Sequence, residues 1–370
     1  MLPDVSPDKA DLKKMTYNPG AVLRFFGKVF YTASQKNLNN MLSKKFKVGI
    51  IGAGSIARKM ADTLRGMQEA ELYAIAARDY SRAETFAREF QAAKAYGSYE
   101  ELADDPEVDL IYIATPHSHH YQHARMCLLK GKPVLCEKAF TANTREAEEL
   151  MRLSEEKRVF LTEAIWTRYM PFSRTIREIV ESGIIGTPTI LTANLGYAIS
   201  NVERLIRPEL CGGALYDVGV YPINFALMTF GEEIEKITST CVKNDLGVDM
   251  QDSITFTYKD GRMAVLYATA YSATDRSAVI SGTLGHIVVE NVNNPQRAIV
   301  YNKDYQEIAR HECPQQITGY EYEVMASCEA IEQGWIESPF MPHAKTIDVM
   351  KMLDNLRAEW EVVYPNDVMQ

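Results

Sequence analysis

The pattern of hydrophobic residues changes along the chain. From residue 46 to about 163, short apolar runs alternate with stretches whose apolar residues recur at helical spacing. We predict strands near residues 46–51, 71–77, 109–113, 133–136 and 159–163, and helices that begin near 54, 82, 119 and 143. Asn143, with Glu146 three residues later, fits a capping box at the last of these helices. The alternation predicts an α/β fold with a doubly wound parallel sheet that binds ligands at the carboxyl ends of its strands.

After about residue 165 the pattern becomes rich in strands. We predict strands at 188–196, 234–242, 251–258, 262–270 and 276–290, and closing helices near 319–333 and 344–360. This pattern is typical of an α+β domain with an open-faced, mainly antiparallel sheet. We therefore expect an extension over 1–45, a nucleotide-binding domain over 46–165, and a domain for substrate binding and dimerisation over 166–370.

The extension differs from the rest of the chain in charge. Residues 1–45 contain eight Lys or Arg and three Asp, whereas the whole chain carries a net charge of -9. Apolar residues recur there at helical spacing, at Val22, Phe25, Phe26, Val29 and Phe30. Two interpretations fit this stripe: a helix on a membrane surface, or a helix that packs on the protein's own body or on a partner subunit. We favour the second, because an exposed Phe-rich stripe is a liability.

Composition excludes several classes of protein. The net charge of -9 argues against a nucleic-acid-binding protein, which usually presents a basic face. The six cysteines lie far apart without a Cys-x-x-Cys pair, so we expect neither a zinc site nor a disulfide framework. No apolar run approaches the roughly 20 residues of a membrane span, and no secretory signal opens the chain. These features favour a cytoplasmic protein.

A glycine-rich turn follows the first predicted strand. Residues 52–57 read Gly-Ala-Gly-Ser-Ile-Ala, in which Gly52 permits a tight turn and Gly54 lets phosphates approach the backbone. The helix that begins with Ser55 and Ile56 directs its N-terminal amides toward negative charge. The third small residue is Ala57 rather than glycine. In this strand-turn-helix context the turn predicts a dinucleotide site.

The end of the second strand indicates which dinucleotide binds. Arg78 lies 24 residues after Gly54, with Asp79 beside it and Arg82 in the next helix. An acidic residue here accepts hydrogen bonds from a free ribose 2′-hydroxyl, whereas arginine neutralises a 2′-phosphate. We favour NADP, bound through Arg78 and Arg82. NAD, bound through Asp79, is the alternative.

Histidines cluster after the strand near 109–113. The chain reads Thr115-Pro116-His117 and continues through His119, His120 and His123. Closely spaced histidines suggest zinc, but no Cys or His-x-x-Glu-His partner accompanies them, so we expect no metal. They follow a strand end where a nicotinamide would lie. We expect Thr115, Pro116 and His120 to line the cofactor.

Two further segments carry candidate chemistry. The strand near 133–136 runs into Glu137 and Lys138, and Lys138 is suited to stabilise a developing oxyanion. Asp217 and Tyr221 stand four residues apart, on one face of a predicted helix. Pro222 cannot donate to the carbonyl of Val218, so we expect a kink beside Tyr221.

Together these motifs resemble the glucose–fructose oxidoreductase / inositol dehydrogenase / rhizopine catabolism family. The resemblance rests on Gly-Ala-Gly-Ser-Ile-Ala, Ala-Thr-Pro-His-Ser-His-His, Leu-Cys-Glu-Lys-Ala and Gly-Gly-Ala-Leu-Tyr-Asp-Val-Gly-Val-Tyr, and covers about residues 46–365. Further segments look like the branch of dimeric dihydrodiol dehydrogenases and D-xylose dehydrogenases. The resemblance implies a Rossmann domain, an open-faced sheet domain, a homodimer or higher homo-oligomer, and hydride exchange between a nicotinamide and a secondary alcohol.

The resemblance also implies residue roles. Glu137 and Lys138 match the family's Glu-Lys-Pro motif, and Tyr221 takes the place of the His in its Asp-x-x-x-His motif, as in the dihydrodiol branch. Ala139 replaces the usual proline, which we expect to loosen the backbone after Lys138, and Leu195 stands where that branch often has an aromatic residue, which weakens the case for an aromatic diol. The expected substrate-binding residues are Trp166, Arg168, Tyr197, Asp217 and Tyr221. Tyr169 is expected to line the same cleft, and a place in the core between the domains is the alternative for Trp166.

The resulting hypothesis is a dehydrogenase of a sugar or vicinal diol. Tyr221 accepts the alcohol proton, Lys138 lowers the pKa of Tyr221, and Asp217 orients the substrate or holds Lys138. One alternative is a hydrolase or lyase that keeps NAD bound and oxidises a sugar carbon transiently. Another is a binding protein that senses the redox state of NADP.

Overall fold

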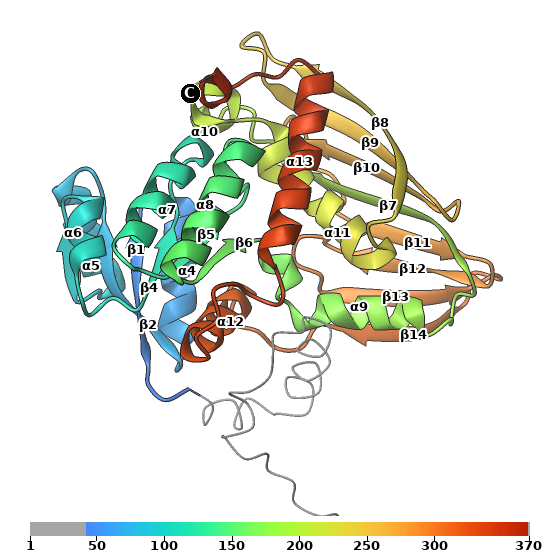
Figure 1. Ribbon diagram of the computed structural model, residues 1–370. Coiled ribbons are helices and arrows are strands. Elements are labelled where there is room, and N and C mark those ends of the chain that lie inside the picture. Colours follow the sequence, from blue (N-terminus) through green and yellow to red (C-terminus); the bar gives the residue numbers. More distant parts are fainter. Residues whose placement is uncertain (1–41, 369–370) are drawn as a thin grey trace, which may run out of the picture. The chain divides into compact units, whose positions relative to one another are not determined.

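The computed structural model describes residues 42–368, and its N-terminal half is built on a six-stranded parallel sheet (Figure 1). The strand order is β3-β2-β1-β4-β5-β6. The strands are β1 (Phe46–Ile51), β2 (Ala70–Ala76), β3 (Lys94–Tyr96), β4 (Leu110–Ile113), β5 (Val134–Glu137) and β6 (Leu161–Ala164). Strands buried on both faces are apolar throughout, as β4 is, and this is why the sequence showed them clearly.

Helices connect these strands in the predicted alternation. They are α4 (Ser55–Gly66), α5 (Tyr80–Phe90), α6 (Tyr99–Asp104), α7 (His120–Leu129) and α8 (Thr144–Lys157). The side chain of Asn143 accepts a hydrogen bond from the backbone N–H of Glu146, which confirms the predicted cap of α8. Glu146 in turn accepts from the backbone N–H of Ala142 rather than from that of the capping residue. The short β3 and α6 were not predicted.

The second half of the chain forms an eight-stranded sheet with the order β14-β13-β12-β11-β7-β10-β9-β8. Only β7 and β10 run parallel among its neighbouring strands, and the other neighbours are antiparallel. This confirms the predicted fold class. The strands are β7 (Pro188–Gly196), β8 (Ile234–Lys243), β9 (Asp249–Tyr258), β10 (Met263–Thr269), β11 (Ala278–Gly282), β12 (Gly285–Glu290), β13 (Arg297–Asn302) and β14 (Glu307–Glu312).

Part of the strand prediction for this sheet was incomplete. Residues 276–290, predicted as one strand, form the hairpin of β11 and β12, in which Gly282 pairs with Gly285. A Cβ on Gly282 would lie 2.3 Å from the carbonyl oxygen of Ile185, so glycine is required there. The strands β13 and β14 were not predicted.

The second half of the described chain also contains six α-helices. They are α9 (Pro171–Glu181), α10 (Glu203–Ile206), α11 (Val220–Phe230), α12 (Glu321–Glu332), α13 (His343–Glu359) and α14 (Pro365–Val368). Figure 1 shows α11 against the strands β7 and β10, and α13 (red) beside α8. Residues of α11 are buried on all sides from Val220 to Ala226, as expected for a helix of nearly continuous apolar sequence. Helix α12 packs back onto the parallel sheet through Val324 and Cys328.

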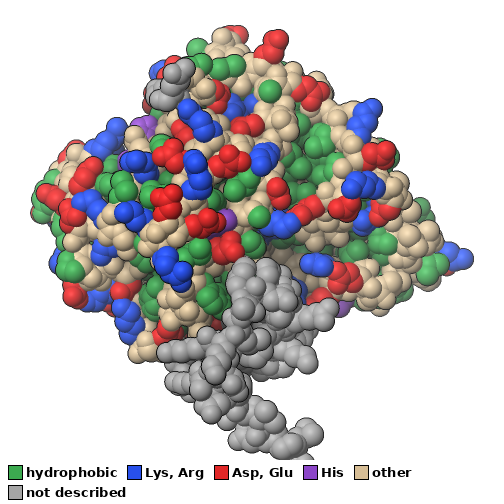
Figure 2. All heavy atoms as spheres, in the orientation of Figure 1, with side chains coloured by type: hydrophobic (Ala, Val, Ile, Leu, Met, Phe, Trp, Pro, Cys, Tyr) green, Lys and Arg blue, Asp and Glu red, His purple; other side chains and the backbone are tan. Residues whose placement is uncertain are grey.

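The predicted apolar stripe at Val22–Phe30 lies outside the described residues, and the division of the chain at residues 45 and 165 stays a prediction. Within residues 42–368 no helix has the length and apolarity needed to cross a membrane. On the face shown in Figure 2, Lys and Arg side chains are interspersed with Asp and Glu. That face therefore lacks the continuous basic surface that nucleic acids require.

Candidate active site

The glycine-rich turn links β1 to α4. Gly52 has φ of +100°, and a Cβ there would lie 2.8 Å from the carbonyl oxygen of Ala114, so only glycine fits. Open space lies in front of Gly54, where a Cβ would meet no atom within 4 Å. Gly54 caps α4 without a side-chain hydrogen bond to the first turn, which begins at Ser55 and Ile56. The turn thus fits the phosphates of a dinucleotide, which accept hydrogen bonds from free helix N-terminal amides.

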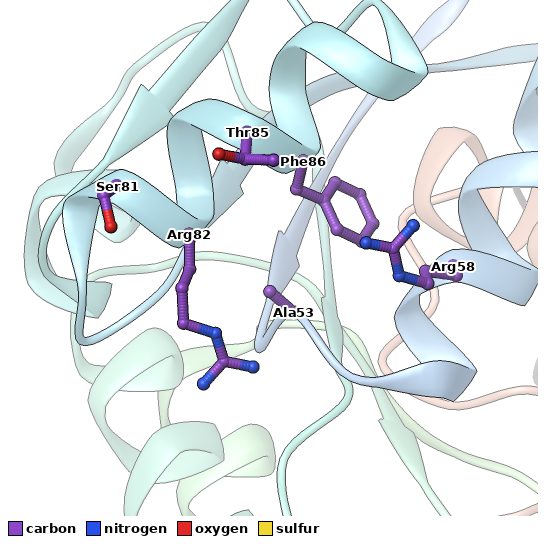
Figure 3. A pocket seen from close by; sticks show the side chains of 6 residues that line it. All are labelled: Ala53, Arg58, Ser81, Arg82, Thr85 and Phe86. Atoms are coloured by element: carbon purple, nitrogen blue, oxygen red, sulfur yellow. The ribbon is translucent and has the colours of Figure 1, made fainter.

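A pocket of about 200 Å³ adjoins this turn, between the end of β1 and the start of α5. Figure 3 shows it lined by Ala53, Arg58, Ser81, Arg82, Thr85 and Phe86. Arg58 is engaged by Glu89 and lies over the rings of Phe86 and Phe90. Within the described residues the guanidinium of Arg82 has no ion-pair partner. The pocket therefore offers a positive charge without a direct ion-pair partner in the described part of the chain, beside the dinucleotide turn.

The side chain of Asp79 already accepts hydrogen bonds within the protein, whereas that of Arg78 pairs with no carboxylate among the described residues. The carboxylate of Asp79 caps α5 by accepting hydrogen bonds from the backbone N–H and hydroxyl of Ser81, and these bonds lower its pKa. Arg78 is exposed, and no carboxylate in the described part of the chain pairs with it. Its charge contributes to the lowered pKa of His119 and His123, so it faces the histidine segment.

His120 connects two loops of the site. One ring nitrogen lies 2.8 Å from the carbonyl oxygen of Thr115 and the other 3.0 Å from that of Ala139. Burial lowers the pKa of His120 to about 4, so the neutral ring donates to one of these carbonyls at a time. The Lys138–Ala139 peptide bond is cis, and the carbonyl oxygen of Ala139 lies within hydrogen-bond distance of the His120 ring. The expected loosening of the backbone by Ala139 stays a prediction.

The other histidines are held by neighbouring groups. His117 is buried and its Nδ1 lies 2.9 Å from the carbonyl oxygen of Cys211, whereas His123 pairs with the hydroxyl of Thr115 at 3.1 Å. Pro116 is the residue before the single helical turn His117–His119. Residues 42–368 contain no group of three or more His, Cys, Asp or Glu side chains arranged to hold a metal ion.

The structure brings Lys138, Asp217 and Tyr221 together at the carboxyl edge of the parallel sheet. The Lys138 Nζ donates to the backbone carbonyl of Asp217 over 2.6 Å and lies 3.5 Å from its Oδ1. It also lies over the ring of Tyr221, 5.1 Å from the ring centroid. Glu137 is buried beneath, where it accepts hydrogen bonds from the hydroxyl of Tyr112 and the backbone N–H of Lys138.

Asp217 lies on a π-helical segment, Leu215–Gly219, that leads directly into α11. This wider turn accommodates Pro222, whose missing N–H and ring would conflict with a regular α-helix, and explains the predicted irregularity. The extra residue of a π-turn rotates the side chains that precede it relative to those that follow. It therefore sets how Asp217 and Tyr221 face Lys138.

Arg204, which sequence reasoning missed, also binds Asp217. Its two terminal nitrogens donate to the two carboxylate oxygens over 2.8 and 3.3 Å. Burial alone would raise the pKa of Asp217, but the charges of Lys138 and Arg204 outweigh it and hold the pKa below its usual value. Asp217 is therefore ionised at neutral pH.

Tyr221 is tied to Trp166, whose indole Nε1 donates to the Tyr221 hydroxyl over 3.0 Å. Trp166 stacks on Tyr320, with ring centroids 4.1 Å apart and planes 6° apart. Burial dominates and raises the pKa of Tyr221 well above its usual value, although the Trp166 hydrogen bond opposes the rise. The hypothesis that the charge of Lys138 works against this rise stays a prediction. Tyr221 is therefore a protonated phenol at neutral pH.

The other residues predicted for the substrate cleft differ in their burial and in their hydrogen-bond partners. Tyr197 follows β7, accepts a hydrogen bond from Asn293 over 3.2 Å, and contributes to the raised pKa of Tyr320. Arg168 donates to the side chain of Asn224 on α11 over 2.6 Å. Tyr169 does not line a cleft as expected, because its ring is buried and its hydroxyl donates to the carbonyl of Glu163.

Comparison with known proteins identifies the family. The pattern of an oxidoreductase family with an NAD-binding Rossmann fold matches residues 46–164, and that of the GFO/IDH/MocA C-terminal domain matches residues 173–288. A trans-1,2-dihydrobenzene-1,2-diol dehydrogenase of Mus musculus is 35% identical over 332 residues, covering 86% of this chain and 98% of that protein. The chain belongs to the GFO/IDH/MocA family of oxidoreductases. This confirms the resemblance found in the sequence, and the N-terminal sheet is the family's nicotinamide-cofactor-binding domain.

Solved structures share the same fold as this family member. KijD10, a 3-ketoreductase of Actinomadura kijaniata in complex with NADP and TDP-benzene, superimposes with a TM-score of 0.78 at 23% identity, covering 85% of this chain and 98% of that one. An aldose-aldose oxidoreductase of Caulobacter crescentus, complexed with glycerol, gives 0.76 at 17% identity, covering 86% and 98%. At these identities the likeness concerns the fold alone.

Proposed function

We propose that this oxidoreductase uses NADP to transfer hydride between the nicotinamide and a secondary alcohol of a sugar or a vicinal diol. The observation that carries the proposal is the cluster of Lys138, Asp217 and Tyr221 beside the predicted cofactor site. It joins an ammonium, an ionised carboxylate and a phenol, the groups that proton transfer to and from a carbinol oxygen requires. The dihydrodiol dehydrogenase name of relatives at 32–35% identity supports the diol class.

The proposed cofactor site combines three parts of the parallel sheet's carboxyl edge. Gly52, Gly54, Ser55 and Ile56 hold the pyrophosphate; Thr115, Pro116, His120, Glu137 and Lys138 surround the nicotinamide. When bound, the nicotinamide supplies or receives the hydride. The domain over 46–165 binds the cofactor and that over 166–370 binds the substrate.

The hydrogen bonds and ion pairing of three side chains favour NADP over NAD. Asp79 is occupied as the cap of α5, whereas Arg78 is exposed and Arg82 lines the adjoining pocket, neither paired with a carboxylate within residues 42–368. Two such arginines are suited to a ribose 2′-phosphate, which needs positive charge and several hydrogen-bond donors.

Tyr221 acts as the proton donor when a carbonyl is reduced. Because an indole N–H is only a donor, Tyr221 accepts from Trp166 and its own proton remains available to a substrate oxygen. Its raised pKa keeps it protonated at neutral pH. The ammonium of Lys138 stabilises negative charge on the same oxygen. At neutral pH the phenol of Tyr221 is therefore in the form that reduction of a carbonyl requires.

The proposed substrate site extends from Tyr221 to Trp166, Tyr197 and Arg168, with Asp217 to orient a hydroxyl. Tyr320, stacked on Trp166, adds a second aromatic face. We also propose a cytoplasmic homodimer. The free state of all six cysteines supports a reducing compartment, and the family resemblance supports pairing through the open sheet face.

The proposal is tested by mixing the protein with NADP or NADPH and a panel of sugars, vicinal diols and the corresponding carbonyl compounds, and following nicotinamide absorbance. Turnover with NADP(H) by one class of substrate supports the proposal. No turnover across the panel, with cofactor retained after dialysis, contradicts it and favours a hydrolase or lyase with internal redox chemistry.

A further inference from the structure

The carboxylate of Asp217 is shared unequally between two cations. Arg204 engages both of its oxygens, at 2.8 and 3.3 Å, whereas the ammonium of Lys138 lies 3.5 Å from one of them. Lys138 makes its short contact, 2.6 Å, with the backbone carbonyl of the same residue. The bidentate geometry of a guanidinium fits a carboxylate better than a single ammonium does. Arg204 is therefore the main partner of the Asp217 carboxylate.

The ion pair differs from an ordinary surface pair. The side chains of Asp217 and Lys138 are 9% and 11% exposed, and Arg204, at 43%, reaches in from the surface. Surface pairs contribute little because water screens them, whereas screening is weak around a buried carboxylate. Screening around the Asp217 carboxylate is therefore weak for both cations, and the part of its charge that pairs with Arg204 is not available to Lys138.

Close backbone contacts around α10 fix the position of Arg204. Arg204 lies on the four-residue helix α10, whose backbone is approached by the two glycines that precede the Asp217 segment. A Cβ on Gly212 would lie 2.2 Å from the carbonyl oxygen of Leu205, and the N–H of Gly213 donates to that oxygen over 2.8 Å. The Cys-Gly-Gly sequence before Ala214 therefore serves to seat α10, and with it Arg204, against Asp217.

We propose that Arg204 is a positioning residue that binds the Asp217 carboxylate and thereby leaves the positive charge of Lys138 free to act on Tyr221 and the substrate oxygen. The inference rests on the proposed function, because it assigns a role within that same site. Without Arg204, the carboxylate of Asp217 would turn to Lys138, and the resulting neutral pair would stabilise negative charge on Tyr221 less well.

Other charged or titratable groups face this cluster and set the background for any pH measurement. His117, buried with its pKa lowered to about 3 by desolvation, carries no charge at neutral pH. The others are Glu137 below Lys138, His120 beyond Ala139, and Tyr320 beside Trp166. None of these residues is altered in the test variants, so their contribution cancels between variants.

The first test needs no turnover. Acetylation of Lys138 by acetic anhydride at pH 8 is followed by peptide mass spectrometry in wild type, Arg204→Gln, Arg204→Lys and the control Arg207→Gln. Arg207 pairs with exposed Glu203 one turn away and makes no contact with Asp217. We expect Lys138 in Arg204→Gln to react about tenfold more slowly, because the carboxylate of Asp217, no longer shared with Arg204, then holds the Lys138 side chain in a closer ion pair. We expect Arg204→Lys to lie between, and Arg207→Gln to match wild type.

Repeating the acetylation comparison in an Asp217→Asn background tests whether Arg204 affects Lys138 through the carboxylate of Asp217. If Arg204 acts through Asp217, Arg204→Gln has little further effect there. An acetylation rate unchanged by Arg204→Gln, or an equal change in both backgrounds, would overturn the proposal. Since this assay does not depend on activity, it remains decisive even if the proposed function fails.

Kinetics supply the second test in the active enzyme. We expect Arg204→Gln to lower kcat while the KM for substrate changes little, and to shift the limb of the pH–rate profile that reports Tyr221 to higher pH. A rise in KM with kcat and the pH profile unchanged would contradict a positioning role and indicate direct substrate binding. The Tm of each variant, measured in parallel, excludes unfolding as the cause.

Discussion

The indole N–H of Trp166 donates a hydrogen bond to the hydroxyl of Tyr221 over 3.0 Å, across 55 residues of sequence. The indole of Trp166 can donate a hydrogen bond but cannot accept one. The hydroxyl of Tyr221 must therefore direct its own proton toward a different acceptor. Tyr320 holds the indole from the other side by stacking. Trp166, predicted as a substrate-binding residue, therefore also orients the phenol that we propose as the proton donor.

Replacement of Trp166 by Phe removes the N–H donor and retains an aromatic ring. A hydrogen bond to a group that becomes charged contributes about 1.5–3 kcal/mol, so we expect kcat to fall about tenfold to a hundredfold. Tyr320→Phe, which keeps the stacking surface, serves as the matched control and should leave kcat near the wild-type value. Equal effects of the two variants on kcat would show that the N–H of Trp166 does not contribute to the reaction.

The raised pKa of Tyr221 gives the two directions of the reaction different pH dependence. Below this pKa the phenol is protonated, so reduction with NADPH should be independent of pH between about pH 6 and 9. Oxidation requires the deprotonated form and should accelerate about tenfold per pH unit over that range. Steady-state kcat measured in both directions checks this. A reduction rate that declines through pH 7 would show that the pKa is not raised.

Arg78 and Arg82 should distinguish NADP from NAD. Loss of one charge-assisted contact to a 2′-phosphate costs about 1.5–3 kcal/mol, so we expect Arg78→Ala and Arg82→Ala each to weaken NADP binding about tenfold to a hundredfold. NAD, which lacks that phosphate, should lose little. Arg88→Ala, at the other end of α5 and paired with exposed Glu84, is the control. Calorimetric titration measures each Kd. Equal losses for both cofactors would reject NADP specificity through these residues.

Glu163 makes stability depend on pH. Its side chain is buried, its Oε2 has no hydrogen-bond partner among the described residues, and burial raises its pKa from 4.5 to about 7. Between pH 4.5 and about 7 the folded protein keeps a proton on Glu163 that the unfolded chain releases. The contribution of this protonated side chain to stability is therefore full below about pH 4.5 and is lost as pH rises toward 7. Glu163→Gln removes the dependence. We expect its Tm to exceed that of wild type at pH 8 and to match it at pH 5; a Tm below wild type at pH 8 would contradict this.

The alternation of strands and helices in the first half could be predicted because strands buried on both faces are apolar runs. Missed elements had weaker signals. The strand β3 has three residues and the helix α6 has six, and β13 and β14 lie toward the sheet edge, where half-exposed strands show little contrast. The hairpin of β11 and β12 was read as one strand because its turn, Thr283-Leu284, lies within an otherwise continuous pattern.

The site was predictable where chemistry follows a strand or a short motif, as at Gly52, Lys138 and Asp217. It was not predictable where a contact depends on tertiary structure. Arg204 lies on a helix of four residues without a motif, and only the glycines at 212 and 213 hinted that something must approach closely there. The partnership of Trp166 with Tyr221 and Tyr320 joins three distant segments, and no local pattern encodes it.

The central claim is that Tyr221 transfers the proton in an NADP-dependent hydride transfer. The most direct measurement compares wild type with Tyr221→Phe, using NADPH and the best carbonyl substrate of the panel, by nicotinamide absorbance under single-turnover conditions. We predict that the variant binds NADPH as wild type does and that its chemical step is slower by about 10²–10⁴-fold, the usual contribution of a general acid. A chemical step at the wild-type rate would contradict the claim and leave Lys138 as the acid.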